Sequence, residues 1–191
     1  FALSEAVDGA GKDVRTVFGV ILGTGCGGGL VIGGRLLDGP MGIAGEWGHN
    51  PLPRPAPDET PGPACWCGRH GCLETWVSGP ALEADAAAPS GVVRTASEIA
   101  AAAASGDAAA AETLQRHTDR LGRGLAHVIN LFDPDVIVLG GGLSKLDHLY
   151  RDLPDAVAPH LFTDRPSVDI RRPVWGDSGG VRGAAWLWDG P

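Results

Sequence analysis

The stretch Gly45–Glu74, GEWGHNPLPRPAPDETPGPACWCGRHGCLE, decides how the rest of this chain is interpreted. It contains three cysteines in a C-x-C-x4-C pattern, Cys65, Cys67 and Cys72, and His49 precedes them across a proline-rich segment. Thiolates and an imidazole are the ligands that a tetrahedral Zn²⁺ prefers, and four protein ligands are usual when the metal is structural. The stretch therefore predicts a structural zinc site formed by His49 and the three cysteines.

Two alternatives stay open at this point. His70 lies inside the cysteine loop and is a rival nitrogen ligand to His49. The cysteines could also be reduced thiols, or form one disulfide with a thiol left over, but an odd trio beside a histidine fits a metal site better. Cysteines spaced for metal, without an even disulfide framework, also indicate a reducing, cytoplasmic environment.

The composition indicates a folded protein and disfavours some partners. The 191 residues are 43% hydrophobic, which is enough for a core, and the formal net charge is −8. Because the arginines and lysines form no basic run, we expect neither nucleic acid nor an anionic membrane as the main partner. No apolar stretch is long enough to span a bilayer.

Two glycine-rich segments follow apolar runs. The β-branched run Thr16–Leu22 predicts a buried strand, and GTGCGGG (Gly23–Gly29) connects it to a second strand from Leu30, which predicts a hairpin. The segment Asp135–Ser144, DVIVLGGGLS, predicts a short strand, a glycine turn and a helix through Leu149. Glycine allows backbone N–H groups to approach a phosphate closely, so both segments are candidate nucleotide-binding elements. Neither is a Walker A or a dinucleotide-binding motif.

Helices are expected over most of the remaining chain. The first two are predicted at residues 2–8 and after Glu74, the latter with a break near Gly79. A third is predicted at Thr95–Ala104, with Thr95 or Ser97 as the cap, and a fourth at Asp107–Phe132, with an apolar stripe that includes Leu131. The last is predicted within Gly176–Trp188, after a strand near Ser167–Ile170. His148 and His160 are predicted to lie on the surface.

Four motifs, AGEWGHN, CWCGRHGCLE, LGTGCGGG and VIVLGGGLS, together resemble the ROK family (repressors, open reading frames and sugar kinases) across essentially the whole chain. The resemblance implies an actin-like (hexokinase, RNase H-like) ATPase fold, with two α/β lobes and an active site in the cleft between them. Residues 1–191 then correspond to the C-terminal lobe, with the zinc and sugar loop 45–74 inserted in it.

The sequence departs from the family pattern in one respect. The D-x-G-G-T phosphate motif and the N-D-A-N-type segment that carries the catalytic aspartate are not found in it. We therefore expect the N-terminal lobe to be absent, assign no catalytic residue within this chain, and expect the chain alone to be inactive.

The resemblance also implies a role for individual residues. It places zinc on His49, Cys65, Cys67 and Cys72, sugar hydroxyls on Glu46, His49 and Glu74, the ATP phosphates on Thr24 and Gly25, and the adenosine beside Gly140, Gly141 and Gly142. Mg²⁺ is expected to accompany ATP. Carboxylates are good acceptors for sugar hydroxyls, which agrees with these roles.

Within the family, EWGHNPLP and GDSGGVRGAAWLW are most similar to bacterial fructokinases. We therefore expect an ATP-dependent kinase that phosphorylates the 6-hydroxyl of fructose, tolerates mannose, forms a homodimer and acts in the cytoplasm. The alternatives are an N-acetylglucosamine kinase or glucokinase of the same family, a sugar-responsive ROK transcriptional repressor, and a zinc-stabilised binding module without catalysis.

Overall fold

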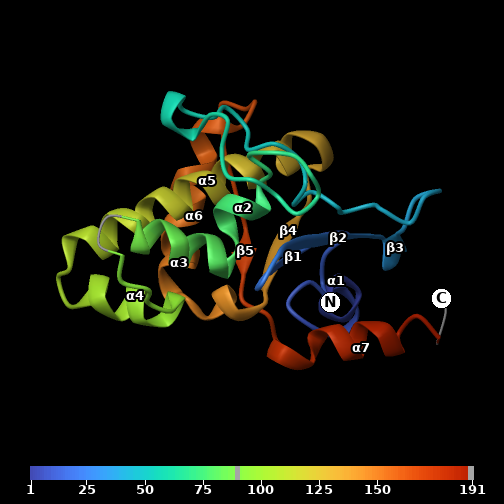
Figure 1. The fold of residues 1–191 in the computed structure, drawn as a ribbon. Helices are drawn as coiled ribbons and strands as arrows, with labels where there is room; N and C mark the ends of the chain where they lie inside the picture. Colours follow the sequence, from blue (N-terminus) through green and yellow to red (C-terminus); the bar gives the residue numbers. More distant parts are fainter. Residues whose placement is uncertain (89–90, 189–191) are drawn as a thin grey trace.

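A sheet of five strands organises the part of the chain that this computed structural model describes, residues 1–88 and 91–188 (Figure 1). The strands are β1 (Thr16–Leu22), β2 (Cys26–Ile32), β3 (Arg35–Leu37), β4 (Val136–Gly140) and β5 (Ile170–Arg171), in the spatial order β3-β2-β1-β4-β5. The first three pair antiparallel, whereas β4 and β5 continue the sheet in parallel with β1. The predicted strand Thr16–Leu22 and its hairpin partner are confirmed.

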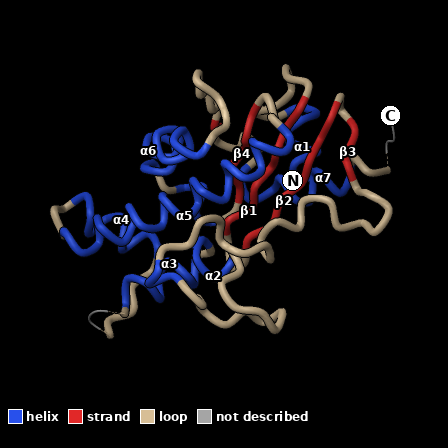
Figure 2. The backbone as a smooth tube through the Cα atoms, turned by 90° about the horizontal axis from the view of Figure 1, so that it is seen from above, coloured by secondary structure: helices blue, strands red, loops and turns tan. Residues whose placement is uncertain are grey.

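Helices cover both faces of the sheet (Figures 1 and 2). One face carries α1 (Ala2–Asp8) and α7 (Gly179–Ala185). The helices of the other side are α2 (Glu74–Val77), α3 (Gly79–Ala87), α4 (Ala96–Ala104), α5 (Ala108–Phe132) and α6 (Asp147–Val157). Single 3₁₀ turns lie at Pro57–Glu59, Gly142–Lys145, Ala158–His160 and Gly176–Ser178. Among the described residues, no helix has the length and apolar character needed to cross a membrane.

Each strand sends alternate side chains to the two faces, which gives two cores. Phe18 and Ile137 point into the larger core beneath α5 and α6, while Val17, Val136 and Val138 contact α1. The residues are 0–2% exposed, as expected for strands covered on both faces. The α/β class that the family resemblance implies is confirmed.

The long helix α5 begins and ends at the predicted positions. Asp107 caps it by accepting a hydrogen bond from Ala110 N at 3.1 Å, and Asp133 ends it in a left-handed conformation with φ 44°. Thr95 rather than Ser97 caps α4, since its hydroxyl accepts from Glu98 N. The apolar stripe of α5 ends earlier than predicted, because Leu131 is 68% exposed.

Three boundaries differ from the prediction. β2 begins at Cys26 rather than Leu30, because Gly27, Gly28 and Gly29 pair with β1, and these cross-strand hydrogen bonds outweigh the low strand propensity of glycine. The turn after β4 is a 3₁₀ turn, and α6 continues to Val157. β5 is limited to Ile170–Arg171, where it pairs with β4.

Candidate functional site

The predicted zinc loop is held together by backbone pairing. Its two ends run antiparallel: Leu52 N donates to Gly71 O at 3.0 Å, Leu73 N to Asn50 O at 2.8 Å, and Glu74 N to Gly48 O at 2.9 Å. The proline-rich segment between these paired ends, called the excursion below, therefore starts and finishes at neighbouring points of the structure. This pairing brings His49 beside Cys72, although 23 residues separate them in the sequence.

Four side chains converge inside this loop. The ligand atoms of His49, Cys65, Cys67 and Cys72 all lie within 4.8 Å of one another. His49 Nδ1 lies 3.5 Å from Cys65 Sγ, and Cys67 Sγ lies 3.6 Å from Cys72 Sγ. Zinc–ligand bonds of about 2.0–2.3 Å in a tetrahedron place the ligand atoms roughly 3.5–3.8 Å apart. The donor set and its spacing therefore fit Zn²⁺.

His49 is the histidine of this cluster. The rival, His70, is exposed and lies on the short bridge that pairs Ala64 with it, outside the group of converging ligand atoms. Burial, followed by hydrogen bonds from Cys67 and Cys65, raises the pKa of the Cys72 thiol to about 12. Because zinc binds thiolates, loading of this cluster would release protons.

Glu74 connects the zinc loop to the first glycine turn. It is the first residue of α2, and its Oε2 accepts a hydrogen bond from Cys26 N at 3.0 Å. Its Oε1 accepts from Trp66 Nε1 at 2.9 Å, and the Trp66 ring meets the His49 ring edge to face, with centroids 4.8 Å apart. One carboxylate thus links two segments that are 48 residues apart.

Glu46 lies on the loop that crosses the start of β2. A Cβ on Gly48 would lie 2.0 Å from Cys26 O, so only glycine allows the loop to approach the strand this closely. Trp47 anchors the loop by packing edge to face on Phe18, and the Glu46 side chain remains exposed. Burial, then Glu74 and Glu46, raise the pKa of the Cys26 thiol, which indicates that both carboxylates lie near the start of β2.

The two glycine turns meet at one edge of the sheet. Ile21 of β1 is in register with Gly140 of β4, so the turn at Gly23–Gly25 lies beside the turn at Gly140–Gly142. Gly141 has φ 78°, and a Cβ on it would lie 2.4 Å from Leu22 O, which explains why glycine is required there. Ligands of open α/β sheets bind outside the carboxyl ends of the strands, where these turns lie.

Sequence reasoning missed an ion cluster beneath the excursion. The Glu59 carboxylate, 7% exposed, accepts hydrogen bonds at 2.9 Å from Arg120 Nε, from Arg123 Nη1 and Nη2, and from Ala56 N. Arg120 also donates to Asp85 at 3.0 Å. The cluster fastens the excursion to α5, and its members are too far apart in sequence for any local pattern to reveal it.

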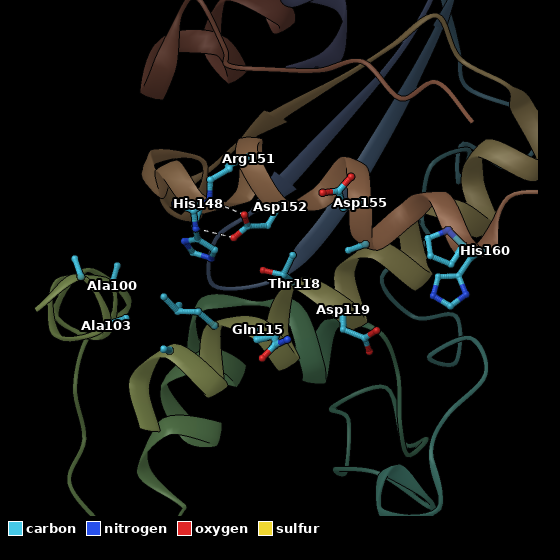
Figure 3. Close-up of a pocket in the computed structure, with 15 residues that line it drawn as sticks. Ala100, Ala103, Gln115, Thr118, Asp119, His148, Arg151, Asp152, Asp155 and His160 are labelled. Atoms are coloured by element: carbon cyan, nitrogen blue, oxygen red, sulfur yellow. Dashed lines mark hydrogen bonds and ion pairs between the residues drawn. The ribbon is translucent and has the colours of Figure 1, made fainter. Parts of the chain in front are cut away.

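A cavity beside α5 lies away from these residues. It has a volume of about 780 Å³ between α4, α5 and α6 (Figure 3). Alanine methyls, Asp119, Asp152 and Asp155 line it, and His148 borders it. The prediction that His148 lies on the surface was wrong, because His148 lies on the buried side of α6 and is only 9% exposed, and burial lowers its pKa. None of the predicted site residues borders this cavity.

Comparison with known proteins decides the family. A model described as the ROK family matches residues 1–190. The chain belongs to the ROK family. An N-acetyl-D-glucosamine kinase of Pectobacterium carotovorum subsp. carotovorum (strain PC1) is 42% identical over 191 residues, which cover 98% of this chain and 63% of that relative. The chain thus spans just under two thirds of the length of this ROK relative.

Two solved ROK structures have the same fold. A glucokinase from Streptomyces griseus in complex with glucose and AMPPNP superposes with a TM-score of 0.86 at 31% identity, over 99% of this chain and 65% of that one. A ROK transcriptional regulator, described as a homologue of the E. coli MLC protein, superposes with a TM-score of 0.83 at 30% identity, over 98% and 49%. The predicted actin-like, hexokinase-type ATPase fold is confirmed.

Proposed function

We propose that residues 1–191 form the C-terminal lobe of an ATP-dependent hexose kinase. The observation that carries the proposal is that two carboxylates and two glycine turns lie together at the carboxyl end of β1. Glu46 and Glu74 lie near the start of β2, and Glu74 accepts a hydrogen bond from Cys26 N beside the first glycine turn. The zinc loop holds the His49 ring against Trp66, which donates a hydrogen bond to Glu74. Carboxylates and imidazoles are suitable partners for sugar hydroxyls, whereas glycine turns at strand ends suit phosphates.

In the proposed mechanism, the side chains of this lobe bind and orient the sugar. Glu46 and Glu74 accept hydrogen bonds from sugar hydroxyls, and the ring nitrogen of His49 that faces away from the cysteines meets another. His49, Cys65, Cys67 and Cys72 would hold zinc, which supplies rigidity to the loop that carries these groups. Catalysis of phosphoryl transfer is largely positioning and charge stabilisation, and the energetic gain from orientation can reach roughly 7–11 kcal/mol.

ATP binds on the two glycine turns in this proposal. Backbone N–H groups at Thr24 and Gly25 hold the phosphates, and Gly140–Gly142 lie beside the adenosine, with Mg²⁺ accompanying the nucleotide. The 6-hydroxyl of the hexose attacks the γ-phosphorus, the bond from this phosphorus to the β–γ bridging oxygen breaks, and ADP leaves with the bonding electron pair. The hydroxyl loses its proton to an aspartate of the N-D-A-N-type segment, which is not among these 191 residues. Such a base commonly contributes about 10²–10⁴-fold in rate.

N-acetylglucosamine is the substrate we favour, in place of fructose. The motif similarity alone favoured fructose, but relatives 39–42% identical over 98% of this chain are N-acetyl-D-glucosamine kinases. This supports the alternative that the sequence had left open. Identity at this level over almost the whole chain is a stronger guide to a substrate than a few short shared motifs.

A hexose panel tests the proposal. The longest polypeptide that the gene encodes, loaded with zinc, is assayed for ADP release with N-acetylglucosamine, glucose, fructose and mannose at equal concentrations. We expect the highest kcat/KM for N-acetylglucosamine, and a Glu74→Gln variant should lose most of it. A higher kcat/KM for fructose would support the fructokinase that the motifs had predicted. If no sugar leads to ADP release, the proposed kinase activity is rejected.

A sugar-responsive regulator is the second candidate. It is supported by the likeness to the ROK transcriptional regulator, which is nearly as close in fold as the glucokinase. A regulator would bind sugar without releasing ADP. Binding of N-acetylglucosamine by calorimetry, together with an inactive hexose panel, would favour this candidate.

A further inference from the structure

Trp66 is an exposed aromatic side chain in the middle of the zinc loop. It lies between the ligands Cys65 and Cys67 and is 81% exposed. Within Gly45–Glu74 it is the one large apolar side chain that remains open to solvent. Full exposure of an indole leaves a large apolar surface in water, which costs free energy. Tryptophan is enriched at surfaces that contact a ligand or a partner, because its ring is apolar while its N–H finds a hydrogen-bond acceptor.

Two contacts fix the orientation of this ring. Its Nε1 donates to Glu74 Oε1 at 2.9 Å, and its edge meets the His49 ring at 84° with centroids 4.8 Å apart. An exposed tryptophan would otherwise sample several rotamers, so this arrangement reduces the entropy lost when something packs on the ring. Both anchors, Glu74 and His49, are residues that we expect to bind sugar hydroxyls. The ring therefore borders the same site.

We propose that Trp66 is a specificity-determining residue that packs against the acetamido methyl group of a 2-acetamido hexose. The inference rests on the proposed function and deepens it. Carboxylates and an imidazole satisfy the hydroxyls of a sugar, but they offer no surface for a methyl group. The exposed face of Trp66 provides that surface beside Glu74. Glucose and fructose carry no acetamido group, so they gain nothing from this contact.

Steady-state kinetics of three variants test the inference, again in the longest encoded polypeptide loaded with zinc. Trp66→Ala should raise KM for N-acetylglucosamine about tenfold, or ~1.4 kcal/mol. It should leave kcat within about twofold, because the contact is the same in the ground and transition states. KM for glucose should change less than about twofold. Trp66→Phe keeps an aromatic face and should stay close to the unchanged protein, as should Phe162→Ala, which removes an aromatic side chain 99% exposed elsewhere.

The outcomes separate this inference from the proposed function. If the unchanged protein phosphorylates sugars and Trp66→Ala raises KM equally for both sugars, or for neither, the inference is overturned while the kinase stands. If the unchanged protein phosphorylates none of the sugars, the proposed function fails. The inference then fails as well, unless saturation-transfer NMR shows that the acetamido methyl group contacts Trp66. Zinc content is measured in each variant, and Trp66→Gln, which also removes the aromatic face and carries the same expectation, replaces Trp66→Ala if Trp66→Ala loses zinc.

Discussion

Replacing Glu59 by glutamine tests how the ion cluster fastens the excursion of the zinc loop. Glutamine keeps the shape of the side chain but removes its charge. Arg120 and Arg123, whose side chains are 9% and 7% exposed, would then keep two buried guanidinium charges without the carboxylate that both contact. Removal of one partner of a buried ion pair typically costs about 3–5 kcal/mol.

The pKa of Glu59 gives a second measure of the same interaction. Burial opposes its ionisation, but hydrogen bonds from Arg123 and Arg120 outweigh burial and lower the pKa from 4.5 to about 2. At ~1.4 kcal/mol per pKa unit this difference corresponds to roughly 3 kcal/mol. A groove of about 440 Å³ beside Glu59 admits water, which screens the charges. We therefore expect Glu59→Gln to lower the free energy of unfolding by about 2–3 kcal/mol at pH 7.

Urea unfolding at pH 7 and pH 3 provides the assay, with zinc removed from all samples because acid would release it. Since the folded pKa is depressed, the stabilisation is present above about pH 4.5 and is lost as the pH falls toward about 2. The difference between the two proteins should therefore shrink by more than half at pH 3. Glu112→Gln, an exposed carboxylate beside the same groove, is the control and should change stability by less than about 0.5 kcal/mol. A difference below about 1 kcal/mol at pH 7, or one that is unchanged at pH 3, would refute the reasoning.

Three further predictions concern the loop and the core. His49→Ala should abolish zinc retention measured by elemental analysis, whereas His70→Ala should retain zinc; the reverse result would identify the wrong ligand. Burial lowers the pKa of His117 to about 4 in the folded protein. Between about pH 4 and pH 6.5 the unfolded state therefore binds one more proton than the folded state, and the free energy of unfolding should rise with pH across that window. A His117→Gln variant that shows the same rise would contradict this. Gly48→Ala should destabilise the protein by more than about 2 kcal/mol, because its Cβ would lie 2.0 Å from a backbone oxygen, whereas Gly27→Ala, with open space around its Cβ, should cost less than about 1; equal losses would argue against the close approach.

Local sequence signals account for the parts of the fold that could be predicted. The β-branched run at Thr16–Leu22, the cap at Asp107 and the cysteine spacing each act over a few residues, and each was found where predicted. The choice of His49 over His70 needed the structure, because it depends on backbone pairing between the two ends of the loop.

Features that depend on distant partners could not be predicted. The strand at Cys26–Gly29 forms because β1 supplies hydrogen bonds that glycine propensity does not favour. Glu59 is more than 60 residues from the arginines that hold it, so no spacing pattern marks it as buried. His148 is buried on the side of α6 that borders a cavity shared with α4 and α5, and no pattern within α6 alone reveals which neighbours cover it.

We propose that Glu46, His49 and Glu74 hold a hexose while the two glycine turns hold ATP. A crystal structure of the longest encoded polypeptide with N-acetylglucosamine and AMPPNP tests this directly. Sugar hydroxyls should lie within hydrogen-bonding distance of those three side chains, and phosphates should lie against the backbone of Gly23–Gly25 beside Gly140–Gly142. A sugar bound elsewhere, such as in the cavity between α4, α5 and α6, or a nucleotide that touches neither turn, would contradict it.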